Sequence, residues 1–522
     1  MGTWADTTAA VRYAYDRVSS WLHGAGDTLV TMMGGETFSQ PWPPPSERPR
    51  INRYTRYRAI YEADHEAVYV RGLGEGATYR YDESRPYLVD NLSGEITDLL
   101  TSRLVGEELH ISGPAEDDDA AAWLQHLAEV SNFSALWPRL SRSVSYRGDG
   151  WLKPVYDEEI GDVLLTSVPA QYTFVETASD DETEIEQVMI AYLRWGDKRP
   201  YLFQEIHRPG EIEYRLYKIY GDLRRDYGYT PHRDRVALDT LPDLADLPDE
   251  QDTGVDELLM VHIGLGGTDD TGIWGTSDYR EIDTLQGELN NRHTQRGEIL
   301  DKHADPPVHG SPEMVNQDGE IDIAGKFFIV KPGEHPPGYV TWDGHLGPSE
   351  NQIHDLRLAM MRNAGVSPES LMDSESGAES GRALKLRQGR TSSAVKARQR
   401  VFGPAIQHAI SLASRLANSP TVDGVWDGAT IPVLEPSEIN LGWGDGLPDD
   451  TREEIEEAGM ELSFGLISRR TAIEQRHPDW NAERVDTEME RIAAERGDVP
   501  APGAGRWRLG LQDEVEEVEE DE

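Results

Sequence analysis

The feature that most constrains the fold of this 522-residue chain is a proline-rich insert between two helical segments. Asp278–His303 is mostly polar with a thin apolar stripe at helical spacing, and the helical pattern returns at Glu350–Ala364. Residues 305–346 contain six prolines, which exclude a continuous helix. A thin stripe on a polar helix favours packing against like helices in an assembly over burial in a monomer core. We therefore expect two long helices that flank a small insert.

Within the insert, the apolar run at Lys326–Lys331 predicts one β-strand, and Tyr339–Trp342 predicts a second. Before Gly148, apolar residues at helical spacing predict three helices, at residues 89–111, 117–130 and 136–145. Strand-like segments follow it, at residues 151–156, 163–168, 188–195, 201–207 and 212–220. Clusters of Asp, Gly and Pro separate these strands and favour an antiparallel sheet. The fold class predicted from these patterns is α+β.

The later part of the chain is again helical. Residues 382–417 predict one long helix, which Pro404 should kink or break. A closing helical unit is expected at Thr451–Gly465 and Ser468–Arg496, with an interruption near Pro478. Eight of the ten residues in Asp513–Glu522 are acidic, and this tail is predicted to be disordered.

The charge of the chain indicates adaptation to salt. It has 50 Lys and Arg residues and 96 Asp and Glu residues, which give a formal net charge of −46. Such a surface repels itself in dilute buffer and becomes tolerable when salt screens it. An acidic disordered protein would have few aromatic residues, whereas this chain has 13 Trp and 21 Tyr. We therefore expect a globular protein from a halophilic source.

Several classes of protein are disfavoured by what the sequence lacks. It has no cysteine, which excludes disulfides, thiolate metal sites and cysteine nucleophiles. It has no apolar run long enough to span a membrane and no secretion signal at Met1–Arg12, so we expect assembly in the cytoplasm and no membrane partner. Gly325-Lys326 is followed by Phe327 and does not complete a phosphate-binding loop.

Acidic clusters at Asp117–Asp119 and Asp180–Glu182 could in principle bind a divalent ion. Such clusters are expected by chance in a chain this acidic. We expect no catalytic residue, cofactor or metal, and the protein is predicted not to be an enzyme. A metal-dependent nuclease that uses these clusters remains a weaker alternative.

The sharpest local signal is a stretch without acid. Ser380–Val422 contains no Asp or Glu in 43 residues. Its cations include Arg382, Lys385, Arg387, Arg390, Lys396 and Arg398. Either the stretch packs against an acidic surface of a neighbouring subunit, or it faces DNA, whose phosphates Lys and Arg bind without sequence specificity.

A second group of cations alternates with tyrosines near the N-terminus. It comprises Arg48, Arg50, Arg53, Arg56 and Arg58, interleaved with Tyr54, Tyr57 and Tyr61. Interleaved Arg and Tyr can bind single-stranded nucleic acid. A contact within or between subunits is the favoured interpretation.

Three motifs carry a family resemblance. Trp274-Gly-Thr-Ser277 leads into the first long helix, Ser380-Gly-Arg-Ala-Leu-Lys385 follows the second, and Gly465–Ile473 lies in the closing unit. In this order around the insert they resemble the portal proteins of tailed double-stranded DNA viruses. The resemblance covers roughly residues 30–497.

The resemblance implies a portal fold, the head–tail connector of the virion. It comprises an N-terminal arm (1–25), a mixed wing (26–277, returning at 418–446), two stem helices (278–304 and 347–366), a small α/β clip (305–346), a tunnel loop (367–381), a long kinked helix (382–417), a helical crown (447–500) and an acidic tail (501–522). The implied assembly is a homododecamer at one capsid vertex, through which DNA is packaged and ejected. The implied partners are the major capsid protein, a head–tail adaptor and the terminase large subunit.

The resemblance also implies two sets of functional residues. The tunnel loop would present Ser370, Asp373, Ser374, Glu375, Ser376 and Glu379 to DNA. The clip would dock the adaptor and terminase through Lys326, Phe327, Phe328, Ile329, Val330, Tyr339 and Trp342. The loop has no cation, so repulsion from phosphates would favour sliding over grip. The main alternative is another virion structural protein, such as an adaptor or capsid subunit.

Overall fold

The computed structural model describes residues 43–44, 46–73, 86–106, 109–114, 117–181, 183–196, 199–219, 231–266, 272–304, 308–309, 333, 338–339, 346–371, 387–422, 426, 431–444, 451–476 and 482–497. The chain divides into two compact units, Met1–Leu447 and Pro448–Glu522, and each is described by itself. The predicted N-terminal arm and acidic tail lie outside the described residues.

The described residues before the sheets form the α-helices α2 (Arg48–Tyr61), α3 (Leu92–Val105), α4 (Asp118–Val130) and α5 (Phe133–Arg147). The side chain of Asn91 caps α3 by accepting from the Gly94 amide, and Asp117 caps α4 by accepting from Ala120. The cap at Asn91 explains why α3 begins later than predicted. The segment of alternating Arg and Tyr, for which no helix was predicted, forms α2.

Two antiparallel sheets follow. One has the order β10-β2-β3, from β2 (Asp149–Asp157), β3 (Asp162–Val168) and β10 (Val261–Gly264). The other has the order β4-β5-β6-β7-β8, with β9 also paired to β7; its strands are β4 (Thr173–Thr177), β5 (Ile185–Trp195), β6 (Pro200–Arg208), β7 (Glu211–Ile219), β8 (Pro231–Val236) and β9 (Glu250–Asp252). The predicted strands are confirmed within a few residues, whereas β4, β8, β9 and β10 were not predicted.

Close hairpins set the register of the larger sheet. Tyr192 lies opposite Phe203 and His207 opposite Ile212. Gly210 has φ +84° in the tight turn between β6 and β7, a conformation that glycine adopts without strain. A further two-stranded sheet pairs β1 (His110–Ser112) with β13 (Asn440–Gly442), and so joins distant parts of the chain.

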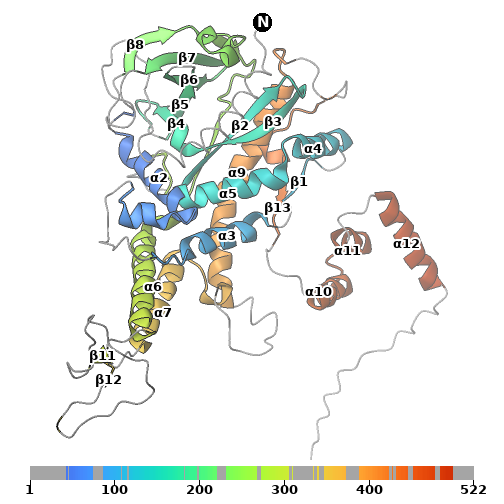
Figure 1. Cartoon of the computed structure of the whole chain (residues 1–522). Coiled ribbons are helices and arrows are strands. Elements are labelled where there is room, and N and C mark those ends of the chain that lie inside the picture. Colours follow the sequence, from blue (N-terminus) through green and yellow to red (C-terminus); the bar gives the residue numbers. More distant parts are fainter. Residues whose placement is uncertain are drawn as a thin grey trace, which may run out of the picture. The chain divides into compact units, whose positions relative to one another are not determined.

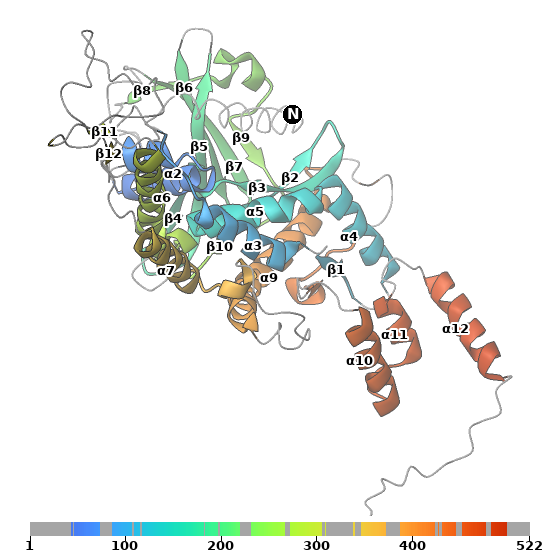
Figure 2. The same cartoon turned by 60° about the horizontal axis from the view of Figure 1, so that its bottom comes forward.

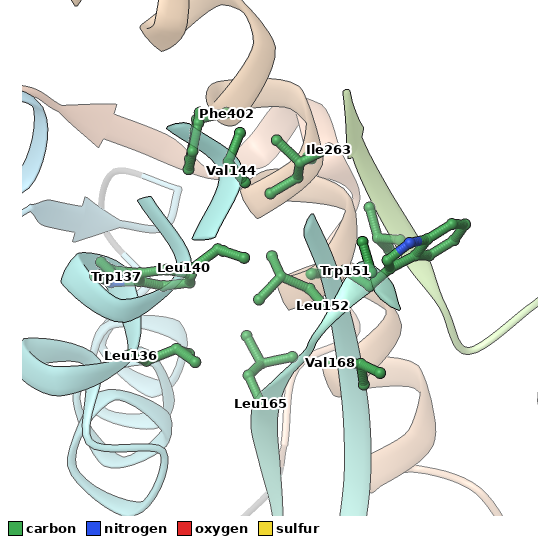
Figure 3. Packing of buried hydrophobic residues seen from close by; sticks show 14 of the residues in the cluster. Leu136, Trp137, Leu140, Val144, Trp151, Leu152, Leu165, Val168, Ile263 and Phe402 are labelled. Carbon is green, nitrogen blue, oxygen red and sulfur yellow. The ribbon is translucent and has the colours of Figure 1, made fainter. Parts of the chain in front are cut away.

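The core of the first unit lies around α9 (Gly389–Ala417), which contacts β2, β3, β10 and α3. Phe402 of α9 belongs to one buried cluster with Val144 of α5, Leu152 of β2 and Ile263 of β10 (Figure 3). Of the predicted kink or break at Pro404, the break does not occur, since α9 is continuous through this residue, and the kink stays a prediction. Pro404 is exposed, so the helical hydrogen bond that it removes is lost on a face open to water.

The predicted helix pair is confirmed. It consists of α6 (Asp283–Ala304), preceded by a 3-10 turn at Asp278–Glu281, and α7 (Gly347–Asn363). The two helices pack along each other, as Figures 1 and 2 show, and in Figure 1 they extend away from the two large sheets. Short strands β11 (Val308–His309) and β12 (Gly338–Tyr339) lie between them in the sequence.

The remaining short elements of the first unit are a π-helical turn at Glu66–Val70 and 3-10 turns at Ala170–Tyr172, Leu238–Thr240, Pro242–Leu244, Pro368–Ser370 and Pro436–Glu438. The second unit contains α10 (Thr451–Phe464), α11 (Arg469–Arg476) and α12 (Ala482–Gly497). The helical segments predicted there are confirmed, with α11 ending before Pro478 and α12 starting after it. None of the described helices has the length and apolar character needed to cross a membrane.

Candidate functional site: the helix pair and the acid-free helix

A buried ion pair fixes the start of α6 to α2. The Arg56 guanidinium donates to both carboxylate oxygens of Asp283, at 2.7 and 2.9 Å. The Tyr69 hydroxyl also donates to Asp283, at 3.0 Å to Oδ1. Removing one partner of a buried pair leaves an uncompensated charge, which is strongly destabilising. The helix pair is therefore held firmly at its base.

A second ion pair joins the turn before α6 to α9. Arg398 donates to both oxygens of Asp278, at 2.6 and 2.7 Å, and the Ser145 hydroxyl donates to the same carboxylate at 2.6 Å. Arg398 is buried and engaged inside its own chain. This contradicts the prediction that Arg398 contacts DNA or a neighbouring subunit.

The polar face of α6 is used within the chain over its first half. Gln286 accepts from the Ser93 amide at 2.9 Å, Asn290 from the Asp90 amide at 3.1 Å, and Thr294 from the Leu88 amide at 3.0 Å. The expectation that this face packs against like helices is therefore wrong for the first half. The polar pattern of α6 gave a wrong prediction because its buried side chains accept hydrogen bonds from backbone amides of the segment around Asp90. Buried backbone groups need such partners, so these polar side chains are not free to contact another subunit. Near the other end of α6, Leu300 is exposed.

Asp90 connects both helices of the pair to the segment before α3. It accepts from His293 of α6 at 3.0 Å and from Arg357 of α7 at 2.6 Å. Burial acts to raise the pKa of Asp90, but the hydrogen bonds and charges of His293 and Arg357 outweigh it and lower the pKa. Asp90 is therefore ionised at neutral pH and holds α6 and α7 together at one point. No local pattern in the sequence marks this contact, because its members are far apart along the chain.

The residue types of the motif before α6 have a structural reason. A Cβ atom at Gly275 would lie 2.2 Å from the carbonyl oxygen of Gly148, so no side chain fits there. Ser277 accepts from the Tyr279 amide at 2.9 Å and caps the 3-10 turn. Trp274 lies under the guanidinium of Arg50, whose Cζ is 3.8 Å from the ring centroid. The motif thus shapes the entry into the helix pair.

Most arginines of α2 make contacts within the chain. Arg50 is buried and donates to the carbonyl oxygens of Ala170 and Thr173, at 3.0 and 2.9 Å. Arg58 pairs with Glu62 at 2.8 Å, whereas Arg53 is exposed. The favoured interpretation, a contact within the protein, is confirmed for Arg50, Arg56 and Arg58.

The two ends of the insert meet at its base. Val308 pairs with Tyr339 and His309 with Gly338 in an antiparallel bridge, which brings these ends together. Of the predicted docking residues, Tyr339 lies on this bridge. The others, Lys326, Phe327, Phe328, Ile329, Val330 and Trp342, lie outside the described residues.

The predicted tunnel loop starts beside α9. The Ser367 amide donates to the Thr391 hydroxyl at 2.9 Å, and the Ser370 hydroxyl lies 3.1 Å from the same oxygen. The loop therefore leaves from a point next to the start of α9. Asp373, Ser374, Glu375, Ser376, Glu379, Arg382 and Lys385 lie outside the described residues.

The described part of the acid-free stretch, residues 387–422, falls into two parts along α9 and the residues just before it. In the first, up to Val401, Arg387, Arg390 and Lys396 are exposed, and Arg390 donates to the Arg362 carbonyl at 2.5 Å. In the second, Phe402–Ala417, most residues are buried in the core of the same chain. For this second part both open interpretations are wrong, since acid is absent because the helix is buried in its own unit.

The acidic clusters considered for a metal have structural roles. Asp117 caps α4, and Asp181 accepts from the Thr183 amide at 2.8 Å. Glu182 lies outside the described residues. Within the described part of the chain, no group of three or more His, Asp and Glu side chains is placed to hold a metal ion.

No model of a known protein family matches the sequence. No curated protein matches it either. Among solved structures, the chain is similar to one from the neck of an empty GTA particle, with 12% identity and a TM-score of 0.42 over 73% of this chain and 88% of that one. It is also similar to one from the neck of a native GTA particle, with 12% identity and a TM-score of 0.37 over 87% of this chain and 96% of that one. At such TM-scores the likeness does not establish a shared fold.

Proposed function

We propose that the chain is the portal subunit of a tailed DNA virus, and that a ring of copies forms the channel for DNA packaging and ejection at one capsid vertex. The observation that carries this proposal is the anchored helix pair. α6 and α7 pack along each other, extend from the body and lead into the β11–β12 bridge at the base of the insert. At the other end, the buried ion pair Arg56–Asp283 holds α6, and the part-buried pair Arg398–Asp278 holds the turn before it.

The length of the helix pair and its attachments to the body support a role as a channel segment. α6 has 22 residues and α7 has 17, which correspond to roughly 33 and 25 Å at the rise of an α-helix. Asp283, Asp278 and Asp90 each bind it to a different element of the body. Such a rigid spacer can transmit load from an insert that docks other proteins, and its exposed end, including Leu300, is available for neighbouring copies.

The DNA-facing surface in this proposal is the first half of α9 and the loop before it. Lys396 and Arg400 lie four residues apart on one exposed helix face, in a chain with a large excess of acid. Exposed cations attract phosphates without reading sequence. The acidic loop would keep this attraction from becoming a tight grip, and the protein would act without a catalytic residue or cofactor.

The proposal includes the wider assembly that the family resemblance implies. A dodecamer in the virion would contact the major capsid protein and would dock a head–tail adaptor and the terminase large subunit through the insert. The net charge of −46 supports a host that lives in strong salt, because screening is then strong enough for such subunits to pack together.

The test is the mass of the purified full chain by light scattering after gel filtration in molar KCl. The proposal predicts a single closed species of about a dozen copies that is preserved across protein concentrations. A monomer at every concentration would contradict it, and a mass that grows continuously with concentration would point to an open polymer instead of a ring.

A further inference from the structure

A cavity of about 410 Å³ lies between α2, α5 and the faces of both large sheets. Its walls come from α5, β2 and β3, with Tyr172 and Glu205 contributed from the larger sheet region. This volume is in the range of small-molecule sites. Asn132, Ala135 and Arg139 line it and have exposed side chains, so the cavity opens to solvent.

Arg147 lines this cavity and differs from the other buried arginines. Arg50, Arg56, Arg194 and Arg398 are also buried, and each has a carboxylate within ion-pair distance. Among the described residues Arg147 has no such carboxylate. Its partners are neutral: the hydroxyls of Ser143 and Tyr146, at 2.8 and 2.6 Å, and the side-chain amide oxygen Oε1 of Gln171 at 3.0 Å.

The guanidinium also has an unused donor. The Nε of Arg147 is buried and has no hydrogen-bond partner within the described part of the chain. A buried charge without a counter-charge is costly, and a buried donor without an acceptor adds to that cost. Arg147 therefore lacks both a negative charge and an acceptor, in a chain with a large excess of acid.

The acidic residues of the cavity do not supply that charge. Glu62 pairs with Arg58, and Glu205 pairs with Lys153. Burial acts to raise the pKa of Glu205, but Lys153 and His207 outweigh it and lower the pKa to about 2, so this carboxylate is ionised and already neutralised.

Asp157 also lines the cavity, from the far end of β2. It accepts from the Glu159 amide at 3.0 Å, and it lies eight residues along β2 from Asp149, which is roughly 26 Å in an extended strand. Asp157 is not among the hydrogen-bond partners of Arg147 in the described part of the chain.

We propose that this cavity binds a small oxyanion, a phosphate or a carboxylate, whose oxygens pair with Arg147. A guanidinium matches such oxygens in charge and geometry. Tyr146 and Gln171 hold the guanidinium in place, since the centroid of the Tyr146 ring lies 4.6 Å from its Cζ and Gln171 is buried beside it. The ligand would complete the junction between α5 and the sheets, and this site does not depend on the portal role.

The test is equilibrium dialysis of the full chain against radiolabelled inorganic phosphate in molar KCl at constant ionic strength, repeated with labelled acetate. We expect saturable uptake of one anion per chain. Arg147→Met should weaken binding by at least about tenfold, since it removes a charge-assisted hydrogen bond worth about 1.5 kcal/mol or more. Arg147→Lys should keep part of the affinity, and Arg53→Met, on an exposed arginine outside the cavity, should keep all of it.

Ala135→Trp provides a second variant in case Arg147→Met does not fold. Ala135 is exposed at the cavity opening, so a large side chain there should block entry while leaving Arg147 in place. Uptake of phosphate or acetate that Ala135→Trp or Arg147→Met abolishes supports the site and identifies which oxyanion it prefers. No saturable uptake by the unmodified chain, or uptake unchanged in both variants, would overturn the proposal.

Discussion

The two halves of α9 both lack acidic residues but differ in burial. In Phe402–Ala417 most residues of the helix are buried, and Ile406, Ala409 and Leu412 are fully buried. In Gly389–Val401 the helix has one buried edge and one exposed face that bears cations. Composition alone cannot separate these cases, because burial and attraction to a polyanion both remove acidic residues. A charge pattern becomes informative once the exposed residues are known.

The largest effect is expected from a charge in the buried half. Ala409→Asp places a carboxylate among apolar side chains without a partner, which should cost more than about 4 kcal/mol and leave little folded protein. Urea unfolding in molar KCl measures this change in the free energy of unfolding. The matched control is Ser393→Asp on the exposed face, where the change should stay within about 0.5 kcal/mol. Equal losses from both substitutions would mean that the two halves do not differ in burial.

A smaller loss of folding stability is expected from the ion pair that joins α9 to the turn before α6. Arg398→Met removes the counter-charge of the Asp278 carboxylate, whose side chain is 12% exposed, and should cost about 3 kcal/mol, the lower end of the range for a buried pair. Arg400→Met, two residues away on the exposed face, should be nearly neutral. Urea unfolding compares the two variants, and the double variant Arg398→Met with Asp278→Asn should recover part of the loss. A stability like that of the unmodified chain in Arg398→Met would show that this pair does not anchor the turn before α6.

The smallest effect on stability, and the clearest on function, is expected from the exposed face. Lys396→Glu with Arg400→Glu should leave unfolding nearly unchanged, because both side chains are exposed. Binding of double-stranded DNA should weaken, and the slope of log K against log salt should fall by roughly 0.9 for each phosphate that the variant no longer neutralises. Fluorescence anisotropy over a range of KCl concentrations measures the slope. An unchanged slope would mean that this face does not meet DNA.

Local patterns predict most of the elements but few of their contacts. The helix pair, the main strands and the closing helices follow from periodicity and from proline and glycine positions, which act over a few residues. The ion pairs Arg56–Asp283 and Arg398–Asp278 join residues more than a hundred positions apart, so no local pattern marks them.

The wrong predictions have the same physical origin. The polar face of α6 predicts contacts between subunits, yet Gln286 and Asn290 are buried within the chain. The basic neighbours of Arg398 predict an exposed cation, although Arg398 lies on the inner face of its helix. Polar residues at a buried junction resemble polar residues at a surface, and only their partners distinguish the two. The proposal of an anion site at Arg147 rests in the same way on its partners, which are all neutral among the described residues.

The most direct test of the portal proposal is electron microscopy of the full chain in molar KCl, resolved well enough to place α9. The proposal predicts a closed ring with a central channel, with Lys396 and Arg400 on the channel wall and the helix pair continuing the channel towards the insert. A ring with these cations on its outer rim, or a protein that remains monomeric and cleaves DNA, would contradict it.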